Sequence, residues 1–123
     1  MDRRDEVAAE LPLRPDTFRI LLALEDGSRH GYAILKQIEQ ATDGAMRLSP
    51  SPFYRKLKRL AERGLVREEE ERPAPDLDDD RRRYYALTER GRVVLKAEAV
   101  RLVGLAGSPQ VMRLAGTDGR GVT

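Results

Sequence analysis

The stretch that decides the fold is residues 48–65, which read LSPSPFYRKLKRLAERGL. Its apolar residues recur at three- and four-residue spacing, the pattern of an α-helix with one buried face. That face carries Phe53, Leu57, Leu60 and Gly64, with Tyr54 and Ala61 beside it. Ser51 is expected to cap the helix and Pro52 to take its first position, where a missing N–H does no harm. Gly64 is expected to end the helix.

The other side of this predicted helix is basic. On a helical wheel centred on Leu57, Arg55 and Arg59 fall opposite the apolar face. The flanks carry Lys56, Lys58 and Arg63. A short helix with an apolar back and a basic front fits the major groove of DNA. Because an ordinary solvated helix shows the same pattern, the choice depends on the segments around it.

The composition fits one small domain and argues against several kinds of site. The 123 residues are 36% charged and 5% aromatic, so the core must be largely aliphatic. The lack of cysteine excludes disulfides and thiolate chemistry and fits a reducing cytoplasm. A single histidine argues against a histidine-based metal site or catalytic triad, and no cofactor is expected. The polar start and the absence of a long apolar run indicate neither a signal peptide nor a membrane helix.

Charge is segregated along the chain. Residues 46–67 carry seven basic residues and one acid, a net +6, and residues 81–96 carry six basic residues and one acid, a net +5. Between them, residues 68–80 carry eight acids and one arginine, a net −7. Two basic blocks around an acidic one predict a local site for a polyanion rather than a generally basic protein.

The N-terminal region is expected to hold an arm and one helix. Residues 1–12 form a frayed arm or a short helix over residues 7–11 that Pro12 ends. Asp16 is the expected N-cap of the first main helix, which stops near the turn signal Asp26–Gly27.

A second helix and a short extended segment are expected next. His30–Gly31–Tyr32 opens the helix, with Tyr32 in its apolar stripe, and Asp43–Gly44 ends it. Residues 46–48 are expected to be extended, as an edge strand. The basic helix would then be the third of three consecutive helices.

A hairpin with a charged tip is expected after the basic helix. Its strands are residues 65–71 and 83–87, since side chains alternate in the second run. Pro73, Pro75 and the acidic run at 76–80 are incompatible with a central strand and predict a connecting loop.

The last long helix is expected to start after its cap, Thr88, and is apolar over more than one stripe. One stripe consists of Leu95, Ala99, Leu102, Val103 and Ala106. Because a monomer would leave much of this surface exposed, we expect it to pack against a second copy of the chain. Alternatively, one stripe packs within the monomer and the remainder is ordinary surface apolarity.

The expected fold is mainly α with a small β-hairpin. Three helices followed by a hairpin describe a winged helix-turn-helix domain, to which a C-terminal dimerisation helix is added. The expected units are an arm or short helix at 1–12, the DNA-binding domain at 13–88, the dimerisation helix at 89–115 and a disordered tail at 116–123.

The chain resembles the PadR family of transcriptional regulators over most of residues 12–100. The matching blocks are FRILLAL at 18–24, HGYAI at 30–34, LSP at 48–50, FYRKLKRL at 53–60, GLV at 64–66 and RRYYALTERG at 82–91. The motif Leu-Thr-x-x-Gly occurs in many winged-helix families. The ordered set of His30-Gly-Tyr, Ser49-Pro50 with Tyr54, and Arg83-Tyr-Tyr is more specific.

The resemblance implies a homodimer that binds pseudo-palindromic operators in double-stranded DNA, usually as a repressor. It implies a dimer interface on the last helix, often helped by the N-terminal one, and loss of DNA affinity on meeting a small molecule or another signal. The effector is unknown. The chain departs from the family at residues 51–54, where Ser-Pro-Phe-Tyr replaces the common Gly-Thr-Leu-Tyr, so Pro52 removes a hydroxyl and an N–H. The wing tip carries Asp76, Asp78, Asp79 and Asp80, which would repel phosphates and are expected to point away or stay mobile.

The candidate DNA-contacting residues are Ser49, Ser51, Tyr54, Arg55, Lys56, Arg59, Arg81, Arg82 and Arg83. Hydroxyls and N–H groups at the helix start suit phosphates, and arginines suit base edges or phosphates. Tyr54 could equally be a core residue with its hydroxyl bonded inside, and Tyr32 is assigned to the core. Lys58 and Arg63 fit a solvated face better than DNA contact. Arg82 could as easily pair with the wing acids.

Two other function classes are compatible with a small domain of this kind. Winged helices also bind proteins, so a protein-interaction module without specific DNA binding is the main alternative. Catalysis is not expected, because the sequence shows no nucleophile–base pair, phosphate loop or metal-ligand spacing, and fold alone does not settle function.

Overall fold

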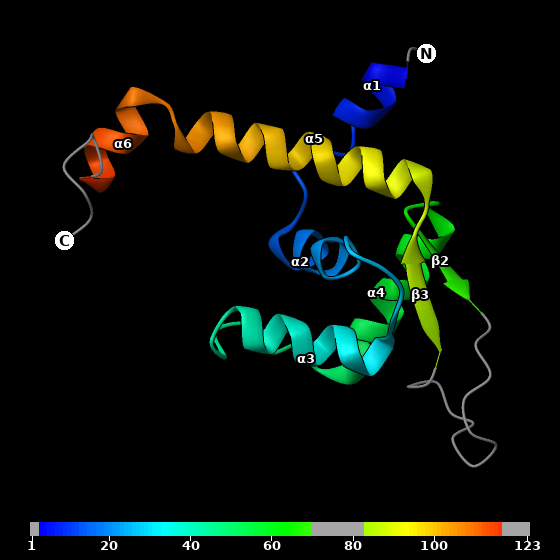
Figure 1. Ribbon diagram of the computed structural model, residues 1–123. Helices are drawn as coiled ribbons and strands as arrows, with labels where there is room; N and C mark the ends of the chain where they lie inside the picture. Colours follow the sequence, from blue (N-terminus) through cyan, green and yellow to red (C-terminus); the bar gives the residue numbers. More distant parts are fainter. Residues whose placement is uncertain (1–2, 70–82, 117–123) are drawn as a thin grey trace.

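The computed structural model describes residues 3–69 and 83–116. The elements in these ranges are α1 (Arg3–Ala8), α2 (Pro15–Ala23), β1 (Arg29–His30), α3 (Gly31–Ala41), α4 (Pro50–Glu62), β2 (Val66–Glu69), β3 (Tyr84–Leu87), α5 (Glu89–Ala106) and α6 (Pro109–Ala115). Figure 1 shows α5 running across the domain, with α1 on one side of it and α2 on the other. A mainly helical chain with a small sheet confirms the predicted winged helix-turn-helix fold.

The sheet has three antiparallel strands in the order β1-β3-β2, with β3 in the centre. β2 pairs with β3 so that Val66 faces Leu87 and Glu69 faces Tyr84. The predicted strand at residues 46–48 is wrong, because these residues form no strand and Met46 and Leu48 instead pack against the core. The third strand is β1, whose His30 ring stacks on Tyr84 with 3.8 Å between ring centroids.

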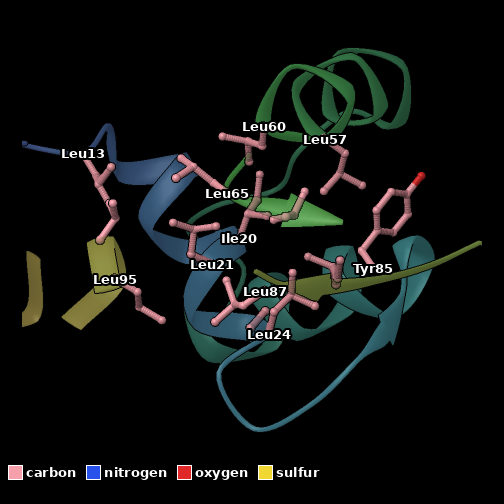
Figure 2. Packing of buried hydrophobic residues seen from close by; sticks show 14 of the residues in the cluster. Leu13, Ile20, Leu21, Leu24, Leu57, Leu60, Leu65, Tyr85, Leu87 and Leu95 are labelled. Carbon is pink, nitrogen blue, oxygen red and sulfur yellow. The ribbon is translucent and has the colours of Figure 1, made fainter. Parts of the chain in front are cut away.

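A single core joins the helices to the sheet. Figure 2 shows Ile20 and Leu21 of α2, Leu57 and Leu60 of α4 and Leu95 of α5 in one cluster with Leu24, Leu65 and Leu87. Burying one such leucine contributes roughly 1.5–3 kcal/mol, so this cluster is the main term that holds α4 on the domain.

Two expectations at the N-terminus are corrected. The short helix is α1, at Arg3–Ala8, because acids in the first turn favour a helix start and Pro12 disfavours a helical conformation at residue 11. Asp16 is not an N-cap. Arg14 holds that place in an extended conformation, because Pro15 fits the first helical position and restricts the residue before it.

The buried face of α3 differs from the predicted one at the start of the helix. Gly31, Ile34 and Ile38 are buried, whereas Tyr32 is 48% exposed and is not a core residue. Ile34, rather than Tyr32, is the buried residue in the first turns of α3. Lys36 lies over the exposed Tyr32 ring, 5.3 Å from its centroid. Asp43 and Gly44 both have a positive φ, which confirms the predicted end of this helix.

Thr88 caps α5 as predicted. Its Oγ1 accepts a hydrogen bond from the N–H of Gly91 at 2.9 Å and donates one to the carbonyl of Gly64. A Cβ atom on Gly91 would lie 1.9 Å from the carbonyl oxygen of Leu65, so only glycine lets α5 start so close to the end of α4. The cap and the glycine together fix the angle between the hairpin and α5.

A buried carboxylate ties the middle of α5 to the segment between α1 and α2. Glu98 is buried, and its oxygens accept hydrogen bonds from the backbone N–H of Leu13 at 3.1 Å and from Arg101 at 2.6 and 3.0 Å. The hydrogen bonds from Arg101 lower the pKa of Glu98 despite its burial. Glu98 is therefore a paired ion that joins two elements far apart in the sequence.

Candidate nucleic-acid interface

The basic helix is α4, and its first turn differs from the prediction. Ser49 is the N-cap and Pro50 the first helical residue, so Ser51 does not cap the helix and Pro52 is not its first residue. The first intrahelical hydrogen bond runs from the N–H of Phe53 to the carbonyl of Ser49 at 3.0 Å. Both prolines thus lie where an N–H would have no intrahelical partner.

This start limits how α4 can bind an anion. Pro50 and Pro52 have no N–H, so Ser51 supplies the one free backbone donor of the first three helical residues. The Ser49 side chain makes no capping hydrogen bond, and both serines are exposed. Phosphate contacts at this end would therefore rely mostly on the two hydroxyl groups rather than on backbone N–H groups.

The exposed face of α4 presents Arg55 and Arg59. Phe53, Leu57 and Leu60 are buried behind them, as the wheel predicted. The Nη1 atom of Arg55 donates to Ser51 Oγ at 3.2 Å, within one turn of the helix. In the described ranges 3–69 and 83–116, the Arg59 side chain has no hydrogen-bond or ion-pair partner. Both guanidinium groups are therefore available to an outside ligand.

One flank of α4 is held by acids of the N-terminal elements. Lys56 Nζ lies 3.0 Å from Asp16 Oδ2, and the Lys56 side chain is only 19% exposed. Arg63 pairs with Glu10, which also accepts a hydrogen bond from Arg90 at 2.7 Å. Lys56, a candidate DNA contact, is thus engaged with α2. Lys58, on the other flank, is exposed.

Burial and pairing act in opposite directions on these two acids. Burial raises the pKa of Asp16, but the hydrogen bond and charge of Lys56 outweigh it and leave the pKa lowered. Burial likewise raises the pKa of Glu10, and the hydrogen bonds from Arg90 and Arg63 bring it below its ordinary value. Both carboxylates are therefore ionised at neutral pH and hold the helix flank by charge.

Tyr54 joins α4 to the start of α3. A Cβ atom on Gly31 would lie 2.6 Å from Tyr54 Cε1, so the tyrosine ring fills the space that glycine leaves. The ring also meets Phe53 edge to face, with 5.1 Å between centroids. Tyr54 is half-buried, which makes it a packing residue at the border of the exposed face. The spacing of Gly31 and Tyr54 in the sequence gave no sign of this contact.

A cleft of about 580 Å³ separates α4 from the hairpin. Its lining residues are Ser51, Tyr54, Arg55, Lys58, Ala61, Glu68, Arg83 and Tyr85. Arg83 donates to Glu68 Oε1 at 2.8 Å across the two strands. The cleft therefore joins three cations and one acid beside the exposed face of α4. Arg81, Arg82 and the wing acids lie outside the described residues.

The candidate dimerisation residues fall into two groups. Leu95 is buried in the chain's own core, and Leu102 is half-buried. Ala99, Val103 and Ala106 are exposed. The largest exposed aliphatic side chains of α5 and α6 are Val100, Val103, Leu105 and Leu114. None of the residues of α6, Pro109–Ala115, is buried, so the apolar surface extends beyond the predicted stripe.

The described residues contain neither a metal cluster nor a membrane span. No group of three or more histidine, cysteine or acidic residues in 3–69 and 83–116 is arranged to hold a metal ion. No helix in the same part of the chain is both long and apolar enough to cross a membrane.

A curated relative matches most of this chain. The chain is 41% identical over 88 residues to an uncharacterized 37.1 kDa protein in transposon Tn4556 of Streptomyces fradiae, an alignment that covers 72% of this chain and 23% of that protein. The chain thus spans less than a quarter of the length of that relative.

Solved structures share the fold. Bacillus subtilis PadR in complex with operator DNA matches with a TM-score of 0.62 and 24% identity, over 72% of this chain and 48% of that chain. A transcriptional regulator from Clostridium thermocellum matches with a TM-score of 0.61 and 24% identity, over 89% of this chain and 96% of that chain. The family model of the transcriptional regulator PadR-like family matches residues 20–97. The chain therefore belongs to the PadR-like family of transcriptional regulators.

Proposed function

We propose that the chain binds a pseudo-palindromic operator as a homodimer and represses transcription from it, in the cytoplasm. The observation that carries the DNA-binding part is the exposed face of α4. Arg55 and Arg59 project from a helix whose apolar side is fully buried, and Arg59 has no ionic partner among residues 3–69 and 83–116. The major groove admits one α-helix, and an arginine can bind guanine through two hydrogen bonds.

The flanking residues suggest how α4 would sit on the duplex. Ser49 and Ser51 lie at its start, where their hydroxyls would donate to backbone phosphates. Arg83 lies across the hairpin cleft and would meet the backbone from the wing side, with Arg81 and Arg82 as further candidates. Tyr54 and Lys56 are half-buried and would position the helix rather than read bases.

The proposal of a homodimer is supported by the exposed apolar surface of α5 and α6. Val100 is 64% and Val103 is 73% exposed, and Figure 1 shows α6 extending past the domain from the end of α5. We propose that residues 89–115 form the dimerisation unit and residues 13–88 the DNA-binding unit. Two linked half-site contacts bind far more tightly than one, because the second contact is intramolecular.

Repression follows most simply from occupancy. A dimer seated on promoter DNA would exclude other proteins from the same sequence. This role is supported by the family, whose members are transcriptional regulators, and by the operator-bound structure of one relative.

The test reverses the charge of the exposed face of α4. Arg55→Glu with Arg59→Glu should reduce DNA binding at least ~100-fold, because two attractive charges become repulsive at the phosphates. The matched control is Lys36→Glu with Arg47→Glu, which changes the net charge equally but at exposed positions outside both α4 and residues 89–115. Binding is measured by gel shift against genomic fragments at several salt concentrations, with circular dichroism and the mass in solution as checks.

The outcomes separate the functions. Loss of binding in the α4 variant alone supports the proposal. Equal binding by wild type and the α4 variant would show that the α4 face is not the DNA-binding surface. A wild-type protein that binds no fragment at low salt would favour a winged-helix module that binds proteins instead.

A further inference from the structure

A second cleft lies on the other flank of α4, away from the hairpin. It has a volume of about 670 Å³, and its charged lining residues are Glu10, Arg14, Asp16, Lys56, Arg59 and Arg63. Its walls are the end of the N-terminal arm, the start of α2 and one side of α4. The proposed function uses two of its residues: Arg59, which also belongs to the exposed face, and Lys56, which positions the helix.

The cleft holds more positive than negative charge. Four of its lining residues are basic and two are acidic, which leaves a formal charge of +2. Both acids are already engaged, Asp16 with Lys56 at 3.0 Å and Glu10 with Arg63 and Arg90. The lowered pKa values of the two acids show that these pairs hold them ionised.

Two arginines remain available in the cleft. The Arg59 side chain has no hydrogen-bond or ion-pair partner in the part of the chain that the structure describes. The Arg14 side chain is 80% exposed and reaches Asp16 only at 3.9 Å, through its Nε atom. Arg14 is also the N-cap of α2 but makes no capping hydrogen bond with its side chain. Each guanidinium therefore keeps most of its donors for a ligand.

We propose that this cleft binds a phosphate group, held between the guanidinium groups of Arg14 and Arg59. Two arginines from different elements suit a group with two negative charges and several acceptor oxygens, since the planar guanidinium fork matches phosphate geometry. The phosphate has two possible sources, a small phosphate ester or the backbone of DNA bound to α4. The second source rests on the proposed function, and the first does not.

The decisive variant is Arg14→Ala. Arg14 lies outside the exposed face of α4, and its loss removes no short hydrogen bond, so the fold should persist. Arg47→Ala is the matched control, because the Arg47 side chain is 74% exposed, reaches one acid, Glu39, at 3.5 Å and lines neither cleft. The first arm titrates inorganic pyrophosphate into DNA-free protein by calorimetry at constant ionic strength. We expect the dissociation constant to rise at least tenfold in Arg14→Ala and to stay unchanged in Arg47→Ala.

The second arm uses duplex DNA. Loss of one phosphate contact should lower the slope of log affinity against log salt by about 1 in Arg14→Ala and leave it unchanged in the control. A response to pyrophosphate without a response to DNA identifies a small phosphate compound as the source, and a response to DNA identifies the backbone. If neither arm distinguishes Arg14→Ala from Arg47→Ala, the cleft is not a phosphate site. The pyrophosphate arm keeps its meaning even if the protein binds no DNA.

Discussion

The two halves of α5 lie in different surroundings although they belong to one continuous helix. In the first half Gly91, Val94, Leu95 and Glu98 are all buried against the chain's own domain. In the second half Val100 and Val103 are mostly exposed. Both halves carry valine and leucine side chains, so hydrophobicity alone does not tell which half packs against the chain's own domain.

The difference lies in what each half meets. The first half is fixed by specific contacts, with the Thr88 cap at its start and the Glu98 carboxylate bound to Leu13 and Arg101. The second half extends past α2 and continues into α6, as Figure 1 shows. A helix that is anchored at one end and apolar at its free end is suited to carry a contact with another molecule. Changes in the two halves should therefore affect different properties.

The largest effect should come from the exposed half. Val100→Glu with Val103→Glu places charges on the proposed dimer surface, and we expect the dimer to dissociate while the helix content stays unchanged. Operator affinity should fall on the order of 1,000-fold, because the two half-sites lose their linkage. Light scattering and gel shifts measure the two effects. A variant that stays dimeric would locate the interface elsewhere.

A change in the anchored half should instead destabilise the monomer. Gly91→Ala puts a Cβ atom 1.9 Å from the Leu65 carbonyl oxygen, and neither backbone can move freely. We expect the free energy of unfolding to fall by about 3 kcal/mol, the upper range for overpacking. Urea unfolding followed by circular dichroism measures the loss. A loss below about 1 kcal/mol, the lower end of that range, would show that the contact between α5 and Leu65 relaxes easily.

The buried ion of the same half should make stability depend on pH. Glu98→Gln is expected to cost about 2 kcal/mol at neutral pH, because a charged acceptor of three hydrogen bonds is lost. Since the pKa of Glu98 is lower in the folded than in the unfolded state, this stabilisation is complete above the ordinary value of 4.5 and disappears as the pH falls below it.

The pH series has an internal check. The pKa values of Glu10 and Asp16 are lowered as well. The free energy of unfolding of the wild type should therefore fall in acid by more than the contribution of Glu98 alone. Unfolding midpoints measured from neutral pH down into acid should therefore decline in both proteins, with a shallower decline in Glu98→Gln. Parallel declines would mean that Glu98 does not titrate differently in the two states.

The smallest effect is expected from Gly104, the glycine in the exposed half of α5. A Cβ atom at this position would have no neighbouring atom within 4 Å, so Gly104→Ala should raise the free energy of unfolding by up to about 1 kcal/mol. The measurement is made in the Val100→Glu/Val103→Glu background, where the helix should have no partner. A destabilised variant would mean that this half contacts the domain after all.

Much of the fold could be predicted because its signals are local. The apolar spacing of α4, the Thr88 cap and the alternation in β3 each depend on a few consecutive residues. The helix starts were misplaced because Asp16 and Ser51 are good caps, while Pro15 and Pro50 fit the first helical position and prevail. β1 was missed because two residues give no pattern without their distant partner.

The site was predictable only in part, because some of its contacts depend on residues that are distant in the sequence. The wheel places Arg55 and Arg59 on the exposed side from spacing alone. The engagement of Lys56 and Arg63 depends on Asp16 and Glu10, which lie about 40 or more residues earlier in the chain, so no local pattern reports it. The burial of Leu95 likewise depends on where α5 crosses α2, which is a property of the tertiary structure.

The two prolines at the start of α4 have a further consequence. Their rings fix φ in the unfolded chain as well as in the folded one, so this turn has little conformational entropy to lose. A helix whose leading turn is already rigid needs little ordering when it enters the major groove, as we propose for α4. The same rigidity leaves α4 less able to adjust to an ill-fitting sequence, which would sharpen its discrimination between operators.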